Sequence, residues 1–289
     1  MLHIHEVLYL HYSKDYLTFV ATESGTFTFS GNSINYSLDS GATWTTLSSG
    51  NATPTITAGS SILWKASGLT PTSGSGIGQF SSTCNFAAEG NIMSLYYGDN
   101  FEGQRSLSGK DNAFRAMFYQ TSGLTSIENL VLPATTLSTQ CYRNMFGGTK
   151  ITSIPTDLLP ATTLATQCYM NMFIGCSNLT DISNLKLPSL TLADTCYQGM
   201  FAQCANLERT PTLSAATLVK ECYIYMYQLS PKINYIKCLA TNISASNCTK
   251  NWVSGVAPIG TFYKASGMSS WTTGNSGIPS GWTVVDYSG

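Results

Sequence analysis

Charge is scarce in this 289-residue chain, and the charged residues do not cluster. They make up 10% of the sequence, and 14 Lys and Arg against 15 Asp and Glu give a net charge of −1. Because a nucleic-acid surface needs clustered cations to neutralise phosphates, the sequence excludes nucleic acid as a partner. No apolar run reaches the ~18 residues that a membrane-spanning helix needs. A polar but weakly charged composition is typical of β-rich extracellular or virion proteins.

Catalytic and metal-binding motifs are missing as well. The sequence contains no C-x-x-C pair and no G-x-S-x-G, H-E-x-x-H or P-loop motif. The nearest pair of carboxylates, Asp99 and Glu102, lies in a glycine-rich segment, where we expect turn hydrogen bonds. We therefore expect a non-enzymatic protein without a cofactor. The weak metal candidates are His3 and His5, whose spacing puts both imidazoles on one face of a strand.

The start of the chain, MLHIHEVLYLHYSKDYLTFV, lacks the basic opening and the small-residue cleavage site of a secretory signal. Two interpretations stay open. The chain is either a mature fragment of an exported protein or a protein that leaves the cell inside an assembled particle, and the initial Met favours the second. We predict a docking arm over residues 1–13 because its apolar part would not be left in solvent; that part comprises Val7, Leu8, Tyr9, Leu10 and Tyr12.

The main feature that is present is an internal repeat. LPATTLSTQCYRNMF (132–146) returns almost unchanged as LPATTLATQCYMNMF (159–173). Copies of the pattern CYxxMF begin at residues 141, 168, 196 and 222, with degenerate copies at 113 and 248. This spacing of 26–28 residues, with degenerate outer copies that act as caps, predicts a solenoid over residues 113–260. We accordingly expect Met117, in the degenerate first copy, to be packed less tightly than Met172.

Each repeat unit divides into two halves. In the first half, Leu137, Cys141 and Met145 follow one another at i, i+4 and i+8, which predicts a short helix. The second half is strand-length and bounded by Gly, Asn and Pro, at residues 124–127, 151–154, 179–182, 207–210 and 233–236. One strand and one short helix per unit is the plan of a leucine-rich repeat.

The stretch MFIGCSNLTDISNLKLPSLTL (172–192) resembles the BspA-like leucine-rich repeats. Such repeats occur in surface proteins of gut Bacteroidales and in proteins of their phages. The resemblance covers residues 113–260, with Met-Phe in place of the family's Ala-Phe. It implies a binding or adhesive role. It also implies that similar β segments precede the repeats.

Five of the nine cysteines recur at one repeat position, and Cys176 and Cys204 share another. We expect them to be small side chains that fill one core position per turn. Packed helices are ~8–10 Å apart, too far for disulfides between neighbouring units. Cys176 and Cys204, near a turn, are the only plausible pair.

The segments that flank the repeats read as β structure. Residues 14–83 contain short alternating strands, and SLDSGATW (37–44) predicts a hairpin, so we expect a small sandwich-like or barrel-like β domain. Residues 84–112 form a connector and entry cap, and residues 261–289 form a closing hairpin over the last repeat. The predicted fold class is therefore α+β: an all-β N-terminal domain, a leucine-rich-repeat α/β solenoid and a C-terminal β cap.

The strand halves vary at two central positions that packing does not dictate. We predict a ligand-binding face there, comprising Thr125, Ser126, Thr152, Ser153, Thr180, Asp181, Glu208, Arg209, Asn234 and Tyr235. The alternative is an ordinary solvated sheet face.

Three hypotheses of function remain. The first is a virion fibre or decoration protein of a phage that infects gut Bacteroidales. It would belong to a larger assembly, join other virion proteins through its arm and display the solenoid to a host glycan or protein. The second is a fragment of a bacterial cell-surface adhesin. The third is a carbohydrate-binding module that uses Trp271 or Trp282.

Overall fold

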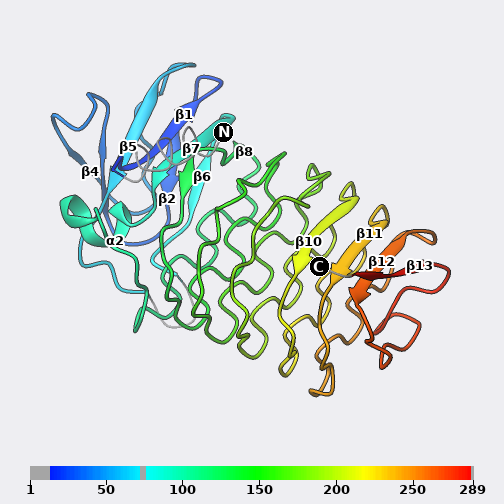
Figure 1. Cartoon of the computed structure of the whole chain (residues 1–289). Coiled ribbons are helices and arrows are strands. Elements are labelled where there is room, and N and C mark those ends of the chain that lie inside the picture. Colours follow the sequence, from blue (N-terminus) through cyan, green and yellow to red (C-terminus); the bar gives the residue numbers. More distant parts are fainter. Residues whose placement is uncertain (1–13, 72–75, 288–289) are drawn as a thin grey trace.

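A computed structural model describes residues 14–71 and 76–287 of the chain. A mixed β-sheet region at the N-terminal end continues into a parallel β-solenoid, and the molecule is elongated (Figure 1). The predicted β region and solenoid are present, but the predicted helices are not. In the described ranges the only helical elements are α2 (Ser94–Tyr97) and the 3-10 turn η1 (Gly98–Asn100). The predicted docking arm, with His3 and His5, lies outside the described residues.

The N-terminal region is built on one seven-stranded sheet, in which the strands follow the order β4-β3-β5-β1-β7-β8 and β9 also pairs with β7. Its strands are β1 (Leu17–Ala21), β3 (Ile34–Ser37), β4 (Thr45–Leu47), β5 (Ser61–Lys65), β7 (Phe86–Asn91), β8 (Leu124–Ser126) and β9 (Leu130–Val131). The pairs are antiparallel up to β1·β7 and parallel from β7 to β8 and β9. Because β8 and β9 belong to the first repeat, the sheet runs without a break into the solenoid.

A second layer made of β2 (Phe27–Phe29) and β6 (Phe80–Ser82) packs on this sheet through aromatic side chains. The ring of Phe19 on β1 lies 4.8 Å from that of Phe80 on β6 and 5.3 Å from that of Phe27 on β2, measured between centroids. Both layers alternate buried and outward-facing residues, as a half-buried strand requires. The β structure expected for this part of the chain is therefore present, as a mixed sheet region that continues into the solenoid.

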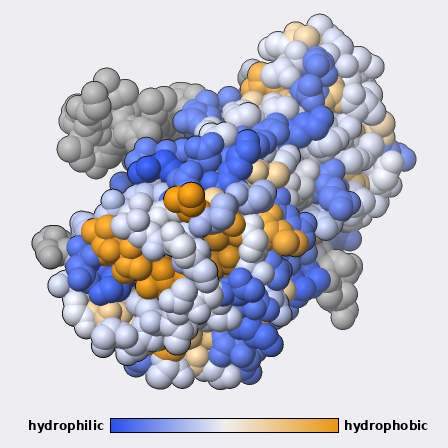
Figure 2. Space-filling model, turned by 90° about the vertical axis from the view of Figure 1, so that its right-hand side faces the viewer, coloured by the Kyte–Doolittle hydropathy of each residue, from blue (hydrophilic) through white to orange (hydrophobic). Residues whose placement is uncertain are grey.

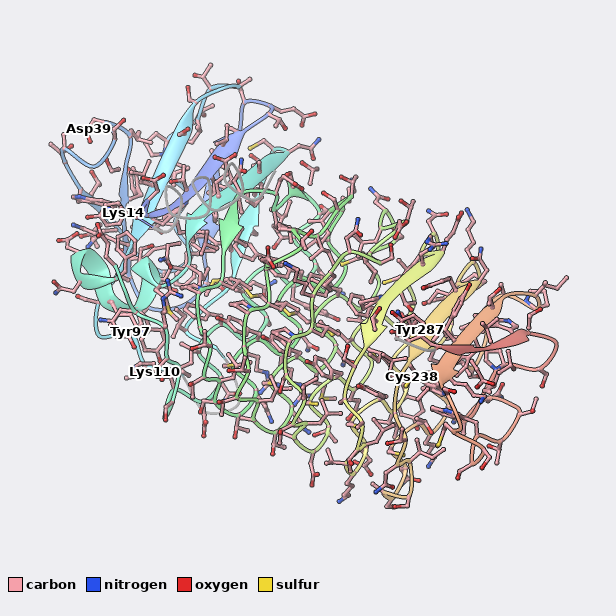
Figure 3. All side chains as sticks on the ribbon, viewed as in Figure 1. Lys14, Asp39, Tyr97, Lys110, Cys238 and Tyr287 are labelled. Carbon is pink, nitrogen blue, oxygen red and sulfur yellow. The ribbon has the colours of Figure 1, made fainter. Side chains whose placement is uncertain are left out.

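The predicted hairpin at residues 37–44 is confirmed, because β3 and β4 pair antiparallel across it. Asp39 organises the turn. Its carboxylate accepts hydrogen bonds from the hydroxyl of Thr43 at 2.6 Å, the backbone N–H of Thr43 at 2.9 Å and the hydroxyl of Ser37 at 2.7 Å. Figure 3 places this residue at the outer end of the N-terminal region, away from the solenoid.

These hydrogen bonds, first of all those from Thr43, lower the pKa of Asp39 from 3.8 to about 2. A carboxyl whose folded pKa is depressed adds stability above its unfolded pKa and loses it as the pH falls through the folded value. The turn should therefore weaken between about pH 4 and pH 2. An NMR titration of Asp39 should move back toward the ordinary pKa in Thr43→Val, and an unchanged midpoint would show that the turn geometry is different.

The segments predicted as helices instead form a coil of successive tight backbone turns, which we call the turn coil. In the copy at residues 138–149, every second N–H bonds to a carbonyl three residues back, as Met145 does to Tyr142 at 3.2 Å. The intervening N–H groups donate to the next copy along the chain, as Tyr142 does to the carbonyl of Cys168 at 3.0 Å. An α-helix would bond each N–H four residues back. Half of the backbone donors therefore hold neighbouring turns of the solenoid together.

Every fourth residue of this coil is left-handed. Gln140, Asn144 and Gly148 have φ of 57°, 57° and 73°, and Gln167, Asn171 and Gly175 repeat the pattern. A left-handed residue reverses the local curvature, so two side chains point inward and the next two point outward. The CYxxMF motif fits this repeat, because Cys141, Tyr142, Met145 and Phe146 are all buried while the residues between them are partly exposed.

Stacking of identical positions produces two continuous columns of aromatic rings. One runs through Phe114, Tyr142, Tyr169, Tyr197, Tyr223 and Trp252, and the other through Phe80, Phe118, Phe146, Phe173, Phe201, Tyr227 and Trp252. Neighbouring centroids in both columns lie 5.4–6.2 Å apart. The columns converge on Trp252, on which Trp271 stacks at 5.6 Å. They therefore tie the N-terminal layers to the last turn.

All nine cysteines are buried and free, so Cys176 and Cys204 do not form a disulfide. Their thiols instead donate to the carbonyls of Phe146 and Phe173 at 3.1 and 3.2 Å, and the hydroxyl of Ser230 takes the same place in the next turn. Burial raises the pKa of the Cys168 thiol to about 12. The prediction that cysteine is a small core side chain agrees with this arrangement.

The strand halves form a regular parallel sheet only near the C-terminal end. It consists of β10 (Arg209–Leu213), β11 (Tyr235–Cys238), β12 (Thr261–Ala265) and β13 (Thr283–Tyr287), about three solenoid turns. Residues 151–154 form no strand, and residues 179–182 contribute a single bridge from Asp181 to Arg209. The expected closing hairpin is wrong, because β12 and β13 pair in parallel as two further turns.

Candidate functional site

A row of exposed and partly exposed side chains crosses the outer face of the parallel sheet where the binding face is predicted. The carboxylate of Asp181 lies 3.5 Å from Nε of Arg209, and the guanidinium of Arg209 lies 4.2 Å from the ring centroid of Tyr235. The ring of Tyr235 lies 5.3 Å from that of Tyr263. These residues come from four consecutive turns of the solenoid, so the repeat itself aligns them.

The next outward-facing position on the strands extends this row. Lys237 follows Tyr235 on β11 with one buried residue between them, and its Nζ lies 3.3 Å from the ring centroid of Tyr287 on β13. We call the five side chains Arg209, Tyr235, Lys237, Tyr263 and Tyr287 the tyrosine–cation face. Figure 3 shows Tyr287 over this sheet, at the C-terminal end of the molecule.

The electrostatics of this face are those of a cationic aromatic surface. Lys237 and Arg209 lie over tyrosine rings, an arrangement in which the negative ring face attracts the cation. The only ion pair that the described residues give to these two cations is the one from Arg209 to Asp181, in which both side chains are about half exposed. Such an exposed pair contributes little to stability, so its side chains can turn to a ligand at low cost.

The other predicted face residues have local roles. Thr125 donates to the carbonyl of Phe86 at 3.2 Å, Ser126 accepts the N–H of Glu128, and Ser153 donates to the carboxylate of Glu128 at 2.9 Å. Thr152, Thr180, Glu208 and Asn234 are exposed, and their side chains do not enter the row. The structure thus brings together Asp181, Arg209 and Tyr235 out of the ten predicted residues.

Sequence reasoning missed Lys237, Tyr263 and Tyr287. Each lies on a strand whose side chains alternate between the core and the outside, and the alternation of Tyr235, Ile236, Lys237 and Cys238 could have shown the first of them. Tyr263 and Tyr287 were assigned to a closing hairpin, so their alignment with Tyr235 on a parallel sheet was not predicted. The error in the fold therefore shortened the predicted site.

The tryptophans proposed for glycan binding lie in or against the core. Trp282 is 7% exposed and donates its Nε1–H to the carbonyl of Ala257 at 2.7 Å. Trp271 is half-buried and stacks on Trp252. Trp282 is therefore a core side chain, whereas sugar binding by Trp271, whose ring is partly exposed, stays a prediction.

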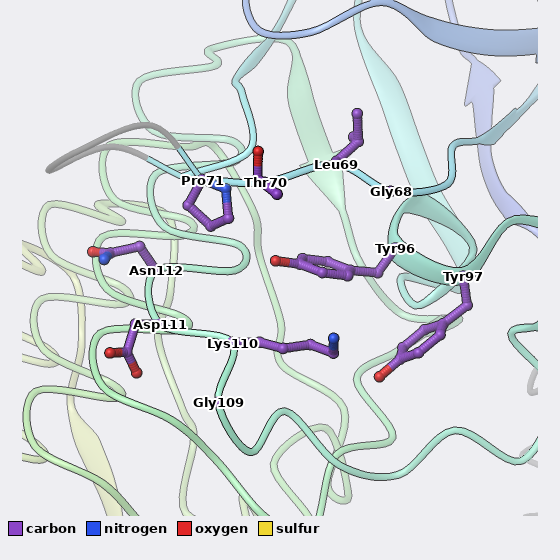
Figure 4. Close-up of a pocket in the computed structure, with 10 residues that line it drawn as sticks. All are labelled: Gly68, Leu69, Thr70, Pro71, Tyr96, Tyr97, Gly109, Lys110, Asp111 and Asn112. Atoms are coloured by element: carbon purple, nitrogen blue, oxygen red, sulfur yellow. The ribbon is translucent and has the colours of Figure 1, made fainter.

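Away from the tyrosine–cation face, a concave region lies where the N-terminal sheet meets the first turn of the solenoid (Figure 4). Its volume is about 790 Å³, and its walls include Tyr96, Tyr97 and Lys110. Nζ of Lys110 lies 4.8 and 5.2 Å from the two tyrosine ring centroids. The neighbouring carboxylate of Asp111 accepts hydrogen bonds from Ser138 and from the N–H of Thr139, and so it ties two turns together.

The carboxylate pair considered for catalysis is part of a structural cluster. Asp99 accepts hydrogen bonds of 2.7 Å from both Lys65 and Tyr16, and Nζ of Lys65 lies 4.1 Å from the ring centroid of Trp44. Burial and then the bond to Asp99 raise the pKa of Tyr16 to about 12. Glu102 is exposed, and the hydrogen bonds of this cluster join Asp99 to Lys65 and Tyr16 without it. The cluster fastens β1 and β5 to the segment that carries α2.

Residues 14–71 and 76–287 contain no group of three or more His, Cys, Asp and Glu side chains placed to hold a metal ion. In the same ranges, no helix is long and apolar enough to cross a bilayer. No family model, no curated protein and no solved structure matches this chain.

Proposed function

We propose that this chain is a non-enzymatic recognition protein whose ligand binds the tyrosine–cation face. The observation that supports the proposal is the unbroken row of Arg209, Tyr235 and Tyr263, with Lys237 and Tyr287 beside it, on a parallel sheet. A stacked sheet holds these side chains on a rigid backbone. Tyrosine provides a large contact area at a small entropic cost, and both tyrosine and arginine are enriched in binding hot spots.

The ligand that suits this face is a surface glycan with acidic groups. The C–H faces of sugar rings can pack against the tyrosine rings, and the phenol hydroxyls can exchange hydrogen bonds with sugar hydroxyls. Arg209 and Lys237 can pair with carboxylate or sulfate groups on the same chain. A protein with an acidic edge is the second candidate ligand. The row of side chains on the tyrosine–cation face is long enough to contact several residues of such a protein.

The setting we propose is the surface of a virion, as a fibre or decoration protein of a phage that infects gut Bacteroidales. The resemblance of the repeats to BspA-like proteins supports this setting, and so does a solenoid that displays one face over several turns. The alternative is a bacterial cell-surface adhesin with the same face. Mass spectrometry of purified phage particles and of bacterial surface fractions from the same culture separates the two, because the chain should be enriched in only one of them.

Binding to an array of acidic and neutral bacterial glycans tests the proposed face. We expect Tyr235→Ala and Tyr263→Ala each to weaken binding about tenfold, or ~1.4 kcal/mol, because each removes a ring from the centre of the row. Tyr225→Asn is the matched control. It removes a half-exposed tyrosine from a coil segment, and Asn tolerates the left-handed φ of 57° there.

Three outcomes would contradict the proposal. One is a chain that binds no acidic glycan and no protein of the host surface. The second is binding that survives in the double variant Tyr235→Ala/Tyr263→Ala. The third is equal loss of binding in Tyr225→Asn, which would place the ligand elsewhere on the solenoid.

A further inference from the structure

Within the residues that the structure describes, the last strand of the solenoid has a free edge. β13 ends the order β10-β11-β12-β13, and among residues 14–71 and 76–287 no strand pairs with its outer side. Thr283 donates its N–H to Gly260 at 2.9 Å, and the carbonyl of Tyr287 accepts the N–H of Ser266 at 3.3 Å, both on the β12 side. Because backbone groups alternate along a strand, the N–H and C=O groups of Val284 and Asp286 point to the open side.

The surface around this edge is apolar. Ile259 is 77% exposed, Val284 45% and Tyr287 37%. Figure 2, which views the C-terminal end, shows an extended hydrophobic area on this face. Proteins usually protect a free edge with charged side chains or proline, but the only charge on β13 belongs to Asp286, which is paired with Lys264. An edge of this kind is a template for another strand.

The opposite end of the solenoid is already covered. There β8 and β9 pair with β7, and the ring of Phe118 stacks on that of Phe80 at 5.8 Å. Two copies therefore cannot join solenoid end to solenoid end in a continuous head-to-tail stack. A partner for β13 must supply a strand from elsewhere.

The sequence contains one segment that fits. Residues 7–12, VLYLHY, contain no Pro, Gly or acidic residue and are apolar or aromatic except for His11, and six residues match the five of β13. The segment precedes Lys14, which Figure 3 places at the end of the molecule opposite Tyr287. At ~3.3 Å per residue, residues 7–13 extend about 23 Å from Lys14, so the β13 edge of the neighbouring molecule must lie beside the start of the described chain.

We propose that residues 7–12 of one copy add as a strand to the free edge of β13 in a second copy. The interface is heterologous, because the donor and acceptor surfaces differ, and it links copies head to tail into a ring or filament. The backbone groups of Val284 and Asp286 bond to the added strand, and its apolar side chains cover Val284 and Ile259. This interface shares only Tyr287 with the tyrosine–cation face, and it does not require the ligand proposed for that face.

Two variants each remove one side of this interface, either the donated strand or the accepting edge. A chain that lacks residues 1–13 keeps the edge but has no strand to donate. Val284→Pro keeps the arm but removes an N–H from the open side, where proline does not disturb the bonds to β12. Val284→Lys is a second edge variant, which keeps the N–H and places a charge in the apolar surface. Circular dichroism and denaturant midpoints establish that each variant is folded.

Sedimentation velocity of the separate and mixed proteins is the test. We expect the full chain to form assemblies that grow with concentration and each variant alone to be monomeric. Mixing the truncated chain with Val284→Pro should give pairs of one to one and nothing larger, because only one functional interface can form. Four results would overturn the proposal: a monomeric full chain, a truncated chain that self-associates or does not fold, edge variants that assemble like the parent, or a mixture that stays monomeric.

Discussion

Replacing Phe173 by alanine should lower the free energy of unfolding by about 3–5 kcal/mol. The ring is fully buried in the middle of its column, with centroids 5.4 Å from Phe146 and 5.5 Å from Phe201. Its removal leaves a cavity that both neighbouring turns line. Backbone hydrogen bonds between those turns resist the collapse that would fill it, so the loss should lie toward the upper end of the range.

Thr166→Ala is the control for this prediction. Thr166 is exposed in the same turn, and its known contact is a backbone bond from Gln140, which alanine preserves. Its effect should stay within about 0.5 kcal/mol. Denaturant unfolding of the three proteins gives both values. A loss below about 1 kcal/mol for Phe173→Ala would mean that the aromatic columns are not part of a close-packed core.

Alanine at Met117 and at Met172 should cost similar amounts, about 2–5 kcal/mol each. The sequence predicts a smaller loss of stability at Met117, because the degenerate first repeat resembles a half-exposed cap. In the structure both side chains are 0% exposed. The carbonyl of Met117 accepts the N–H of Phe80 at 2.9 Å, so the N-terminal layers cover this turn as the next repeat would.

The same unfolding measurement distinguishes the two expectations for the methionines. Equal losses support a first turn that is buried under β6. A loss at Met117 near zero would show that the N-terminal region does not dock on the solenoid. Ser122→Ala is a suitable control near the first site because Ser122 is exposed.

The repeat pattern was sufficient to predict a solenoid and most of its core. The recurring residues Cys, Tyr, Met and Phe face inward in each complete copy, and the variable residues between them face outward. Their identity does not depend on the exact backbone, because any repeating structure must bury the same positions in every turn. This is why the core of the solenoid was predictable while its secondary structure was not.

The helix prediction failed because a spacing of four fits two structures over a short distance. An α-helix has 3.6 residues per turn, so Leu137, Cys141 and Met145 would drift around its face by only a fraction of a turn. The distinguishing signal is on the outside. Gln140, Asn144 and Gly148, also four apart, include two of the residue types that tolerate a left-handed backbone. A helix gives no reason for Asn and Gly to recur at that interval.

The candidate site was predictable in part for the same reason. Two strand positions that vary between repeats contain Arg209 and Tyr235, and the structure places both on the tyrosine–cation face. The positions of Tyr263 and Tyr287 in the row depend on the parallel pairing of β11, β12 and β13. No repeated sequence motif indicates that pairing. Long-range pairing of this kind follows from the path of the chain and not from local sequence.

The most direct test of the turn coil is the pair of substitutions Lys220→Gly and Glu221→Gly. Glu221 is left-handed, with φ of 55°, and its exposed neighbour Lys220 is not among the residues with positive φ. Glycine removes the strain of a left-handed side chain, which is of the order of 1 kcal/mol, but elsewhere it lowers stability by about 0.5–1 kcal/mol. The coil predicts that Lys220→Gly is less stable than the parent chain in denaturant unfolding and that Glu221→Gly is as stable or more so. Similar losses of about 1 kcal/mol at both positions, as in the interior of an α-helix, would contradict it.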